Sequence, residues 1–286
     1  MTDTIGFIGV GNIASAVVAA LATAPGPAPA ILLSPRNAVK SAALAERLPG
    51  VAVARDNQAV LDGSRTVFLS LRPQAVPEVL PGLRFDPEHT IISLIPLPLS
   101  LLTPLVHPAT RILRALVLPT CAQRLLAVPC WPETPEICGM LERLGPLLPL
   151  REEGELDVLW ASTAAVSSFY ALLETLSEWS AERGVPPAIA ADFTAGMAVV
   201  LARVALTGNP DRFSRLAAEA ATPGGLNEQV LALQRIGGSC ARLREALDVV
   251  LARIAGLEAG PERLLGGGPL DAGAGEKRCP SALIRP

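Results

Sequence analysis

A glycine-rich turn near the start of the chain is the first stretch whose residues could do chemistry. Gly9, Gly11 and Ala14 follow an apolar run and precede a segment of helical spacing. Gly9 would allow a tight turn, Gly11 would let a pyrophosphate approach the backbone, and Ala14 would let helix and strand pack closely. The phosphates would lie on the free N–H groups at the helix start. The pattern predicts a dinucleotide site, with a turn that serves packing alone as the alternative.

A second polar cluster follows the next predicted strand, residues 30–33. Ser34, Arg36 and Asn37 stand at its end, and no acidic residue does. An acid there would accept a hydrogen bond from the ribose 2′-hydroxyl of NAD, whereas a cation and hydroxyls suit a 2′-phosphate. We therefore expect NADPH to be preferred over NADH. The alternative is that Arg36 is a solvated loop residue.

Alternating strands and helices must position these groups. Continuous apolar runs, of which residues 66–71 are an example, are typical of parallel strands that are covered on both faces. The alternation predicts a doubly wound sheet of the Rossmann type over residues 1–152. The expected strands after the glycine turn are residues 30–33, 51–54, 66–71, 90–94, 112–117 and about 125–129. Helices are expected at residues 39–48 and just after Asp56.

The second half of the chain has a helical pattern. Its expected helices are residues 155–183, 187–206, 210–221, one that begins at Asn227, and 239–257. These helices are apolar over wide arcs, and a small helical domain at 153–257 has little interior to bury them. A homodimer joined through this domain is the simplest explanation, and a self-contained bundle is the alternative. Residues 258–286, rich in glycine, are expected to form a flexible tail.

Composition excludes several classes of protein. The net charge is −3 and no Lys/Arg cluster is present, which argues against nucleic-acid binding. No uninterrupted apolar run is long enough for a membrane span, and no secretory signal is visible. The five cysteines show no CxxC spacing and there are two histidines, so we expect reduced thiols, no metal site and a cytoplasmic protein.

Several segments stand in an order that resembles the pyrroline-5-carboxylate reductase family over about residues 4–257. Residues 6–18, GFIGVGNIASAVV, are similar to the opening motif of that family, and Asn57 falls on its cofactor-contacting asparagine. Residues 34–36 fall where the family selects NADP, and residues 70–74 resemble its Val-Lys-Pro-Gln turn with Arg for Lys. Residues 222–225 resemble its Ser-Pro-Gly-Gly signature.

The resemblance implies a two-domain fold, a dimer, and reduction of a cyclic imine by NAD(P)H, with pyrroline-5-carboxylate as the default substrate. The cofactor-binding residues are expected to be Gly9, Gly11, Asn12, Ile13, Ala14, Ser34, Arg36, Asn37, Asn57, Leu71, Arg72 and Pro73. The substrate-binding residues are expected to be Gly224, Gly225, Leu226 and Tyr170. The catalytic residues are expected to be Asn227 and Thr222.

The departures from the family pattern all fall on the substrate side. Leu226 and Asn227 stand where two small hydroxyl residues are usual. Residues 165–170 keep only the tyrosine and a nearby serine of a Gly-Ser-Gly-Pro-Ala-Tyr segment, and residues 116–120 lack an asparagine. An imine reductase for another substrate is therefore one alternative. A catalytically silent nucleotide-binding protein is a second.

The types of residue present agree with imine chemistry. The helical half holds no histidine, and the two lysines, Lys40 and Lys277, lie in the cofactor half and the tail. Reduction of a ketone needs a proton donor, whereas a cyclic imine arrives partly protonated and needs mainly orientation and electrostatics.

Three other features are given structural interpretations. The acidic run at 152–155 is expected to be a solvated domain junction. Trp160 is expected to be a core or interface anchor, and Cys121 a buried residue rather than a nucleophile.

Overall fold

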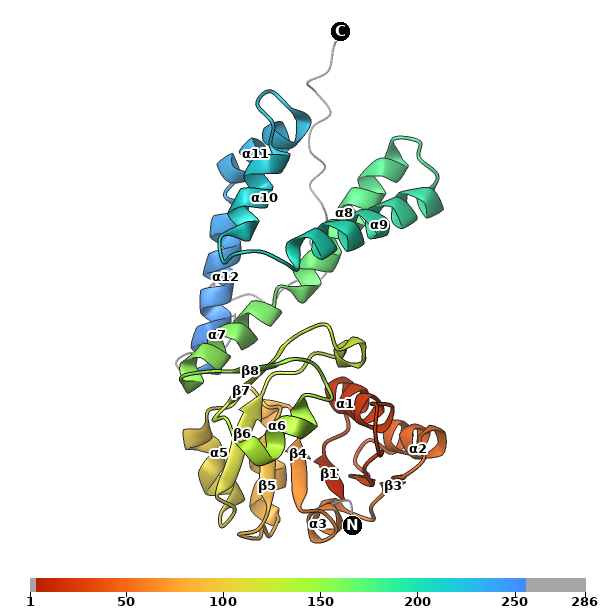
Figure 1. The fold of residues 1–286 in the computed structure, drawn as a ribbon, viewed down its shortest axis with the longest axis vertical. Coiled ribbons are helices and arrows are strands. Elements are labelled where there is room, and N and C mark those ends of the chain that lie inside the picture. Colours follow the sequence, from red (N-terminus) through yellow and green to blue (C-terminus); the bar gives the residue numbers. More distant parts are fainter. Residues whose placement is uncertain (1–3, 256–286) are drawn as a thin grey trace.

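The computed structural model describes residues 4–255, which form a sheet at one end and helices that extend away from it (Figure 1). The sheet has eight strands in the order β3-β2-β1-β4-β5-β6-β7-β8. The strands are β1 (Ile5–Ile8), β2 (Ile31–Leu33), β3 (Val51–Val53), β4 (Thr66–Leu69), β5 (Thr90–Ser93), β6 (Arg111–Ala115), β7 (Val128–Trp131) and β8 (Leu147–Pro149).

The first six strands are parallel, while β7 runs antiparallel to β6 and β8 runs parallel to β7. The order 3-2-1-4-5-6 is that of a doubly wound nucleotide-binding sheet, whose strand order reverses between β1 and β4. The expected fold class is confirmed. The helical elements that accompany the sheet are α1 (Asn12–Ala22), α2 (Ala38–Arg47), α3 (Asn57–Asp62), η1 (Pro73–Ala75), α4 (Val76–Val79), η2 (Leu80–Gly82), α5 (Leu99–Val106), η3 (Cys121–Gln123) and α6 (Pro135–Leu141).

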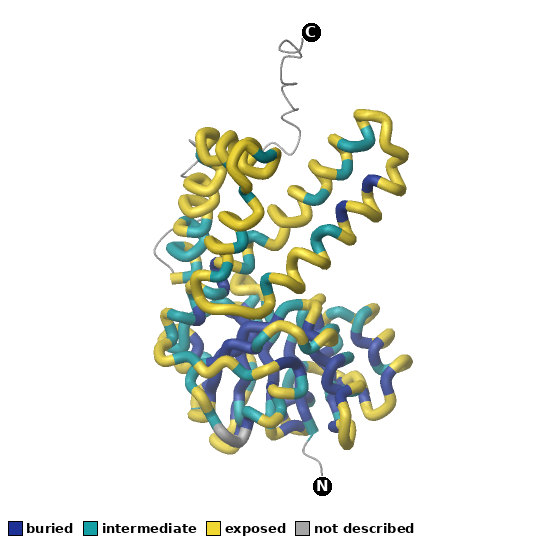
Figure 2. The backbone as a smooth tube through the Cα atoms, turned by 45° about the horizontal axis from the view of Figure 1, so that its top comes forward, coloured by how far each residue is buried: buried dark blue, intermediate teal, exposed yellow. Residues whose placement is uncertain are grey.

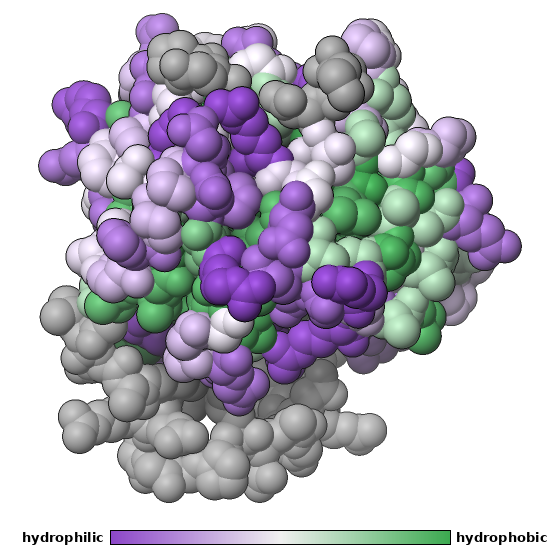
Figure 3. Space-filling model, turned by 90° about the horizontal axis from the view of Figure 1, so that it is seen from below, coloured by the Kyte–Doolittle hydropathy of each residue, from purple (hydrophilic) through white to green (hydrophobic). Residues whose placement is uncertain are grey.

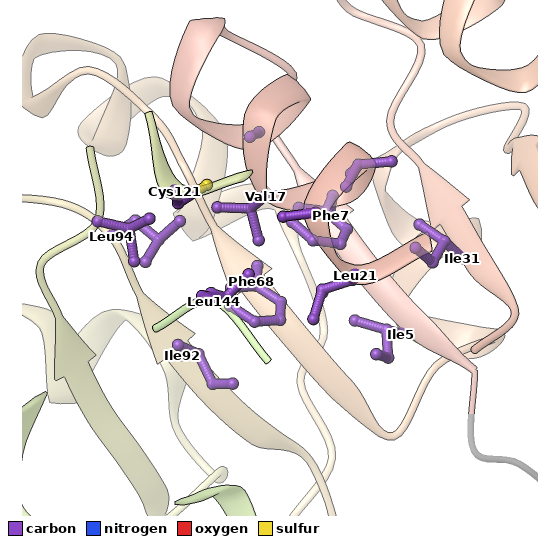
Figure 4. Close-up of a cluster of buried hydrophobic side chains, with 14 of the residues drawn as sticks. Ile5, Phe7, Val17, Leu21, Ile31, Phe68, Ile92, Leu94, Cys121 and Leu144 are labelled. Carbon is purple, nitrogen blue, oxygen red and sulfur yellow. The ribbon is translucent and has the colours of Figure 1, made fainter. Parts of the chain in front are cut away.

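The sheet is buried on both faces. Successive side chains of a strand point to opposite faces, and each face packs into an apolar cluster. Phe7 of β1 and Phe68 of β4 stack with their ring centroids 4.7 Å apart on one face. Figure 4 shows this cluster, in which Val17 and Leu21 of α1 lie beside the rings. Ile8, one residue further along β1, belongs to the cluster on the opposite face. Because both faces are buried, the residues of such a strand are mainly apolar on either face, and the strand sequences are therefore largely continuous apolar runs.

Three residues separate the sheet from the helical part, since β8 ends at Pro149 and α7 begins at Glu153. Its helices are α7 (Glu153–Thr163), α8 (Val166–Glu182), α9 (Pro187–Ala205), α10 (Arg212–Ala220), α11 (Leu226–Ile236) and α12 (Ser239–Ile254). The pair α8 and α9 forms one arm, and α12 returns along α7 toward the sheet (Figure 1). The tail expected at 258–286 lies outside the described residues.

The prediction of one continuous helix over residues 155–183 is wrong. The chain forms α7 and α8, separated by Ala164 and Ala165. The hydroxyls of Ser162 and Thr163 each donate to the carbonyl three residues earlier, and the Ala164 N–H bonds to the Ala161 carbonyl. These bonds tighten the last turn of α7 and compete with the regular helical ladder. The periodicity of the apolar residues continues across the break, which is why the pattern concealed it.

The helical part, α7 to α12, exposes most of its surface in a single chain (Figure 2). Two helical stretches, residues 153–182 and 187–205, are long and apolar enough to cross a membrane by length and composition alone. The exposed large apolar side chains of this part are Val158, Val166, Phe169, Tyr170, Leu172, Leu176, Trp179, Val185, Ile189, Phe193, Val199, Val200, Leu201, Val204, Leu206, Phe213, Leu226, Val230, Leu233, Ile236 and Leu243. The sheet domain, in contrast, has a closed apolar core.

Candidate active site

The glycine turn has the geometry of a phosphate-binding loop. Gly9 has φ +90, and a Cβ there would lie 2.5 Å from the carbonyl oxygen of Ser70. Gly11 is the N-cap of α1 and contributes no side-chain cap, and a Cβ on it would meet nothing within 4 Å. Gly9 is therefore needed by the turn itself, whereas Gly11 leaves open space over the first amides of α1. That space and the positive end of the helix suit a pyrophosphate.

Ser34 and Asn37 hold the turn in shape. The Gly9 N–H donates to Ser34 Oγ at 2.9 Å, and Ser34 is completely buried. Asn37 Nδ2 donates to the Val10 carbonyl at 3.1 Å, while Asn37 Oδ1 accepts from the backbone of Lys40 and caps α2. The sequence assigned both side chains to the cofactor. In the structure their direct contacts are with the backbone around the turn.

Two cationic side chains, those of Arg36 and Lys40, also follow β2 and lie nearer to the surface than Ser34. Arg36 is exposed, and its guanidinium lies 3.6 Å from the Glu78 carboxylate of α4. An exposed pair of this kind contributes at most about 1 kcal/mol, so Arg36 is free to turn toward a phosphate. The Lys40 ammonium donates to Asn12 Oδ1 at the first residue of α1. Sequence reasoning missed Lys40 as a candidate, although its place in the first turn of the helix after β2 was a usable signal.

The remaining predicted cofactor residues follow β3 and β4 at the same edge of the sheet. Asp56 caps α3 by accepting from the Ala59 N–H at 2.7 Å, which places Asn57 as the first residue of that helix. Leu71, Arg72 and Pro73 follow β4 and lead into η1. The carboxyl ends of parallel strands share one edge, so the structure brings the predicted cofactor residues together there.

A pocket of about 440 Å³ lies where this edge meets the helical part. Pro73 and Gln74 follow β4, Pro96 and Leu97 follow β5, and the opposite wall comes from α7 and α12. We call this cavity the junction pocket; its full lining is Pro73, Gln74, Pro96, Leu97, Leu101, Trp160, Thr163, Ala164, Val250, Arg253 and Ile254. Its size suits a small organic ligand, and its walls are mainly apolar.

The predicted substrate loop between α10 and α11 is well ordered by its own contacts. The Gly225 N–H donates to the Thr222 carbonyl at 2.8 Å, and a Cβ on Gly225 would lie 2.5 Å from Thr222 Oγ1. The Gly224 N–H donates to Glu228 Oε2 at 2.7 Å, and Asn227 Nδ2 donates to the Ala220 carbonyl at 3.1 Å. Glu228 thus already provides a negative charge at the N-terminus of α11.

In one chain this loop is not brought to the glycine turn. Helices α10 and α11 pack on α9 and α12 and lie away from the sheet (Figure 1). Tyr170 of α8 is 61% exposed and lies edge-on to Phe169, and Leu226 is 83% exposed. The placement of Thr222, Asn227 and Tyr170 beside a cofactor therefore stays a prediction that needs a second chain.

A buried ion-pair cluster joins the sheet to α7. Arg114 of β6 is completely buried, and its guanidinium lies 2.6 Å from Glu153 and 2.7 Å from Asp157. Glu153 also accepts from the Leu99 N–H at 2.7 Å, and the guanidinium carbon lies 4.9 Å from the centre of the Trp160 ring. Trp160 is buried, in agreement with its expected role as an anchor. The cluster fixes the wall of the junction pocket that α7 supplies.

This cluster corrects the interpretation of the acidic run at 152–155 as a solvated junction. Glu153 is partly buried against Arg114, because a buried guanidinium needs carboxylate partners. Glu155 pairs with Arg151, and hydrogen bonds from the Arg151 backbone and side chain lower the pKa of its carboxyl.

The described cysteines of the sheet domain, Cys121, Cys130 and Cys138, form no disulfide. Burial raises the pKa of Cys121 above its usual value, and burial together with nearby Cys138 raises the pKa of Cys130 to about 11. Cys121, next to the predicted substrate segment, is therefore a poor nucleophile. Among the described side chains of residues 4–134 and 137–255, no group of three or more His, Cys, Asp or Glu is placed to hold a metal ion.

A hollow of about 820 Å³ lies at the opposite edge of the sheet. Thr4, Arg65 and His89 line it, and they come just before β1, β4 and β5. Viewed from this side, much of the surface is hydrophilic (Figure 3). The strand ends that line this hollow are the amino ends, so it lies away from the glycine turn, and ligands of such sheets bind at the carboxyl ends.

Comparison with known proteins agrees with this geometry. A family model described as NADP oxidoreductase coenzyme F420-dependent matches residues 4–96. Pyrroline-5-carboxylate reductase 3 of Danio rerio is 30% identical over 236 residues, which cover 77% of this chain and 80% of the relative.

Solved structures share the fold over nearly the whole chain. A crystal structure of 1-pyrroline-5-carboxylate reductase from Streptococcus pyogenes has a TM-score of 0.76 at 22% identity, and covers 89% of this chain and 99% of its own. A reductive aminase from Aspergillus terreus, in complex with NADPH and ethyl levulinate, has a TM-score of 0.59 at 18% identity, with 94% and 96% covered.

The sheet order, the glycine turn and the helical second half together define an NAD(P)H-dependent oxidoreductase. The expected reaction class, reduction of a C=N bond, is confirmed by the sequence relatives. The chain belongs to the pyrroline-5-carboxylate reductase family.

Proposed function

We propose that the protein is an NADPH-dependent reductase of a cyclic imino acid, with pyrroline-5-carboxylate, reduced to proline, as the default substrate. The observation that carries the cofactor assignment is the open space over Gly11 at the start of α1, with Arg36 and Lys40 close by. No acid follows β2, so a 2′-phosphate meets cations there instead of a carboxylate. The sheet domain would be residues 1–152 and the helical domain 153–257.

The side chains needed for this reaction bind and orient rather than transfer protons. When bound, NADPH supplies a hydride to the imine carbon. An iminium accepts that hydride without an acid from the protein, and the amine nitrogen keeps the proton it already carries. Asn227 would orient the ring nitrogen through its free Oδ1, because its amide nitrogen is bonded to the Ala220 carbonyl. Thr222 and Gly225 would hold that loop in place.

A homodimer is part of the proposal. The arm of α8 and α9 exposes large apolar side chains in one chain, among them Phe193, Val200 and Leu201. An apolar surface of this extent is typical of an interface between subunits. A second chain packed on it would also bring the α10–α11 loop of one chain toward the cofactor edge of the other. The same burial explains two membrane-length apolar helices in a cytoplasmic enzyme.

The decisive experiment measures NADPH oxidation with pyrroline-5-carboxylate, with its six-membered homologue and without an imine. Dissociation constants for NADPH and NADH are measured separately by quenching of tryptophan fluorescence. Arg36→Asp should weaken NADPH binding at least about tenfold and leave NADH nearly unchanged, because a charged hydrogen bond contributes about 1.5–3 kcal/mol. Equal loss for both cofactors would refute the NADP assignment. NADPH binding without turnover of either imine would favour another substrate, or a silent nucleotide-binding protein.

The dimer is tested by light scattering coupled to size-exclusion chromatography. Val200→Asp places a charge on the exposed face of α9 and should give a monomer. Val39→Asp, at an even more exposed apolar position on α2 of the sheet domain (81% exposed, against 59% for Val200), is the control and should stay a dimer. A monomeric wild-type chain would contradict this part of the proposal.

A further inference from the structure

The loop between α10 and α11 already holds a carboxylate of its own chain. Glu228, in the first turn of α11, accepts a hydrogen bond from the Gly224 N–H through Oε2 at 2.7 Å. Gly224 has φ +72, and a Cβ on it would meet nothing within 4 Å. The carboxylate of Glu228 therefore bonds a backbone amide at a residue that has open space beside it. Another anion that used this amide would have to displace Glu228.

The neighbouring amides of the loop differ in how far they are already used. The Gly225 N–H donates to the Thr222 carbonyl at 2.8 Å and is closed to a ligand. Gly225 is the N-cap of α11, and it brings no side-chain acceptor to the first amides of the helix, those of Leu226 and Asn227. An acid group bound at this loop would find these two amides and the Gly224 N–H. Of these three donors, the Gly224 N–H is the one that a carboxylate holds.

The charge of Glu228 acts on ligands beyond this one bond. The N-terminus of a helix carries roughly half a positive elementary charge, which attracts an anion. Glu228 offsets that charge, and a ligand carboxylate beside it would meet a like charge. Glu228 is also exposed, so an acid can displace its side chain at a cost in affinity. A ligand without an acid group leaves the bond between Glu228 and Gly224 in place.

We propose that Glu228 is a specificity-determining residue, whose carboxylate competes with the acid group of the substrate for the Gly224 N–H and the N-terminus of α11. This inference rests on the proposed function, in which this loop binds a cyclic imino acid. The loop remains the substrate site, and Glu228 sets how strongly that site favours acids over imines without an acid group. Removal of the competing charge should improve the binding of acids, whereas loss of a merely structural contact would weaken it.

The test compares steady-state KM values for pyrroline-5-carboxylate and for 1-pyrroline, which lacks the carboxylate. In Glu228→Gln, KM for the acid should fall about fivefold or more and KM for 1-pyrroline should stay within about twofold, because the acid no longer displaces a charged acceptor. Glu245→Gln removes the same charge from an exposed position on α12 and is the matched control, with both KM values expected within about twofold of wild type. A KM for the acid that is unchanged or raised in Glu228→Gln would overturn the inference and leave the proposed function intact. An equal fall for both imines would also overturn it, since the effect would not depend on the acid group.

A binding experiment separates the inference from the proposed function if no imine is reduced. The probe is tetrahydrofuran-2-carboxylate, a ring acid of the same size without a C=N bond, titrated calorimetrically into the protein at saturating NADPH. Glu228→Gln should bind this acid about fivefold or more tightly than wild type does, for the same reason. That result would support the role of Glu228 even if the proposed reaction fails. Equal or weaker binding to Glu228→Gln, or no binding to either protein, would overturn it.

Discussion

Replacement of Arg114 by methionine is the sharpest test of how the two parts of the chain are joined. The guanidinium is completely buried and makes close pairs with Glu153 and Asp157, whose side chains are only 23% and 14% exposed. Arg114→Met leaves two carboxylates without their cationic partner in a largely buried site. Loss of one member of such a cluster costs about 3–5 kcal/mol. We expect about 3 kcal/mol, because both carboxylates keep some contact with water and Glu153 keeps its bond from the Leu99 N–H.

The assay is urea unfolding followed by circular dichroism, with a thermal scan beside it. A loss of about 3 kcal/mol corresponds to a fall in Tm of roughly 6–12 °C for a chain of this size. Arg111→Met on the same strand is the control, since its pair with Glu88 is exposed and should contribute less than about 1 kcal/mol. The triple variant Arg114→Met, Glu153→Gln, Asp157→Asn should recover at least half of the lost stability. Equal unfolding midpoints for Arg114→Met and Arg111→Met would refute the reasoning.

Three further outcomes are expected. Gly11→Ala should leave the Tm of the cofactor-free protein within about 1 °C but abolish NADPH binding, because its Cβ meets only the space meant for the cofactor. Gly9→Ala should also lower the Tm, because its Cβ would clash with the Ser70 carbonyl. Equal Tm values for the two variants would contradict this. Ser34→Ala should cost about 1 kcal/mol or more of stability and weaken NADPH and NADH alike, because the partly buried Gly9 N–H loses its acceptor. A loss confined to NADPH would show direct contact with the 2′-phosphate. At pH 8, the exposed Cys240 should react with iodoacetamide within minutes, whereas Cys130 should react only after unfolding. Cys130 is buried, and burial raises its pKa to about 11, so little thiolate is available. Peptide mass spectrometry checks this, and rapid labelling of Cys130 would contradict it.

Local patterns were enough to predict the sheet domain. The apolar run before Gly9 is a strand because its residues must fill both faces of a parallel sheet, and the turn that follows is tight because only glycine fits beside the Ser70 carbonyl. The structure shows both. β8 was missed because three residues, Leu147–Pro149, are too short to show a period and contain a proline.

Contacts between distant parts of the chain were not predictable from these patterns. Arg114 and Glu153 are separated by 39 residues, and no local spacing signals a buried ion pair over that distance. Ser34 has the residue type expected for a phosphate ligand, yet its hydroxyl is used by the Gly9 backbone 25 residues away. The sequence could suggest which residues take part in the site, while their partners depend on the packing of the sheet and α7.

The position of the α10–α11 loop has a kinetic consequence. Under the proposed dimer, cofactor binding uses residues of one chain, whereas turnover also needs the loop of another. Dilution below the dimer dissociation constant should then abolish turnover while NADPH still binds. Two inactive variants, one damaged at Gly11 and the other at Asn227, should regain activity when they are mixed, because each heterodimer reassembles one intact site from two damaged chains.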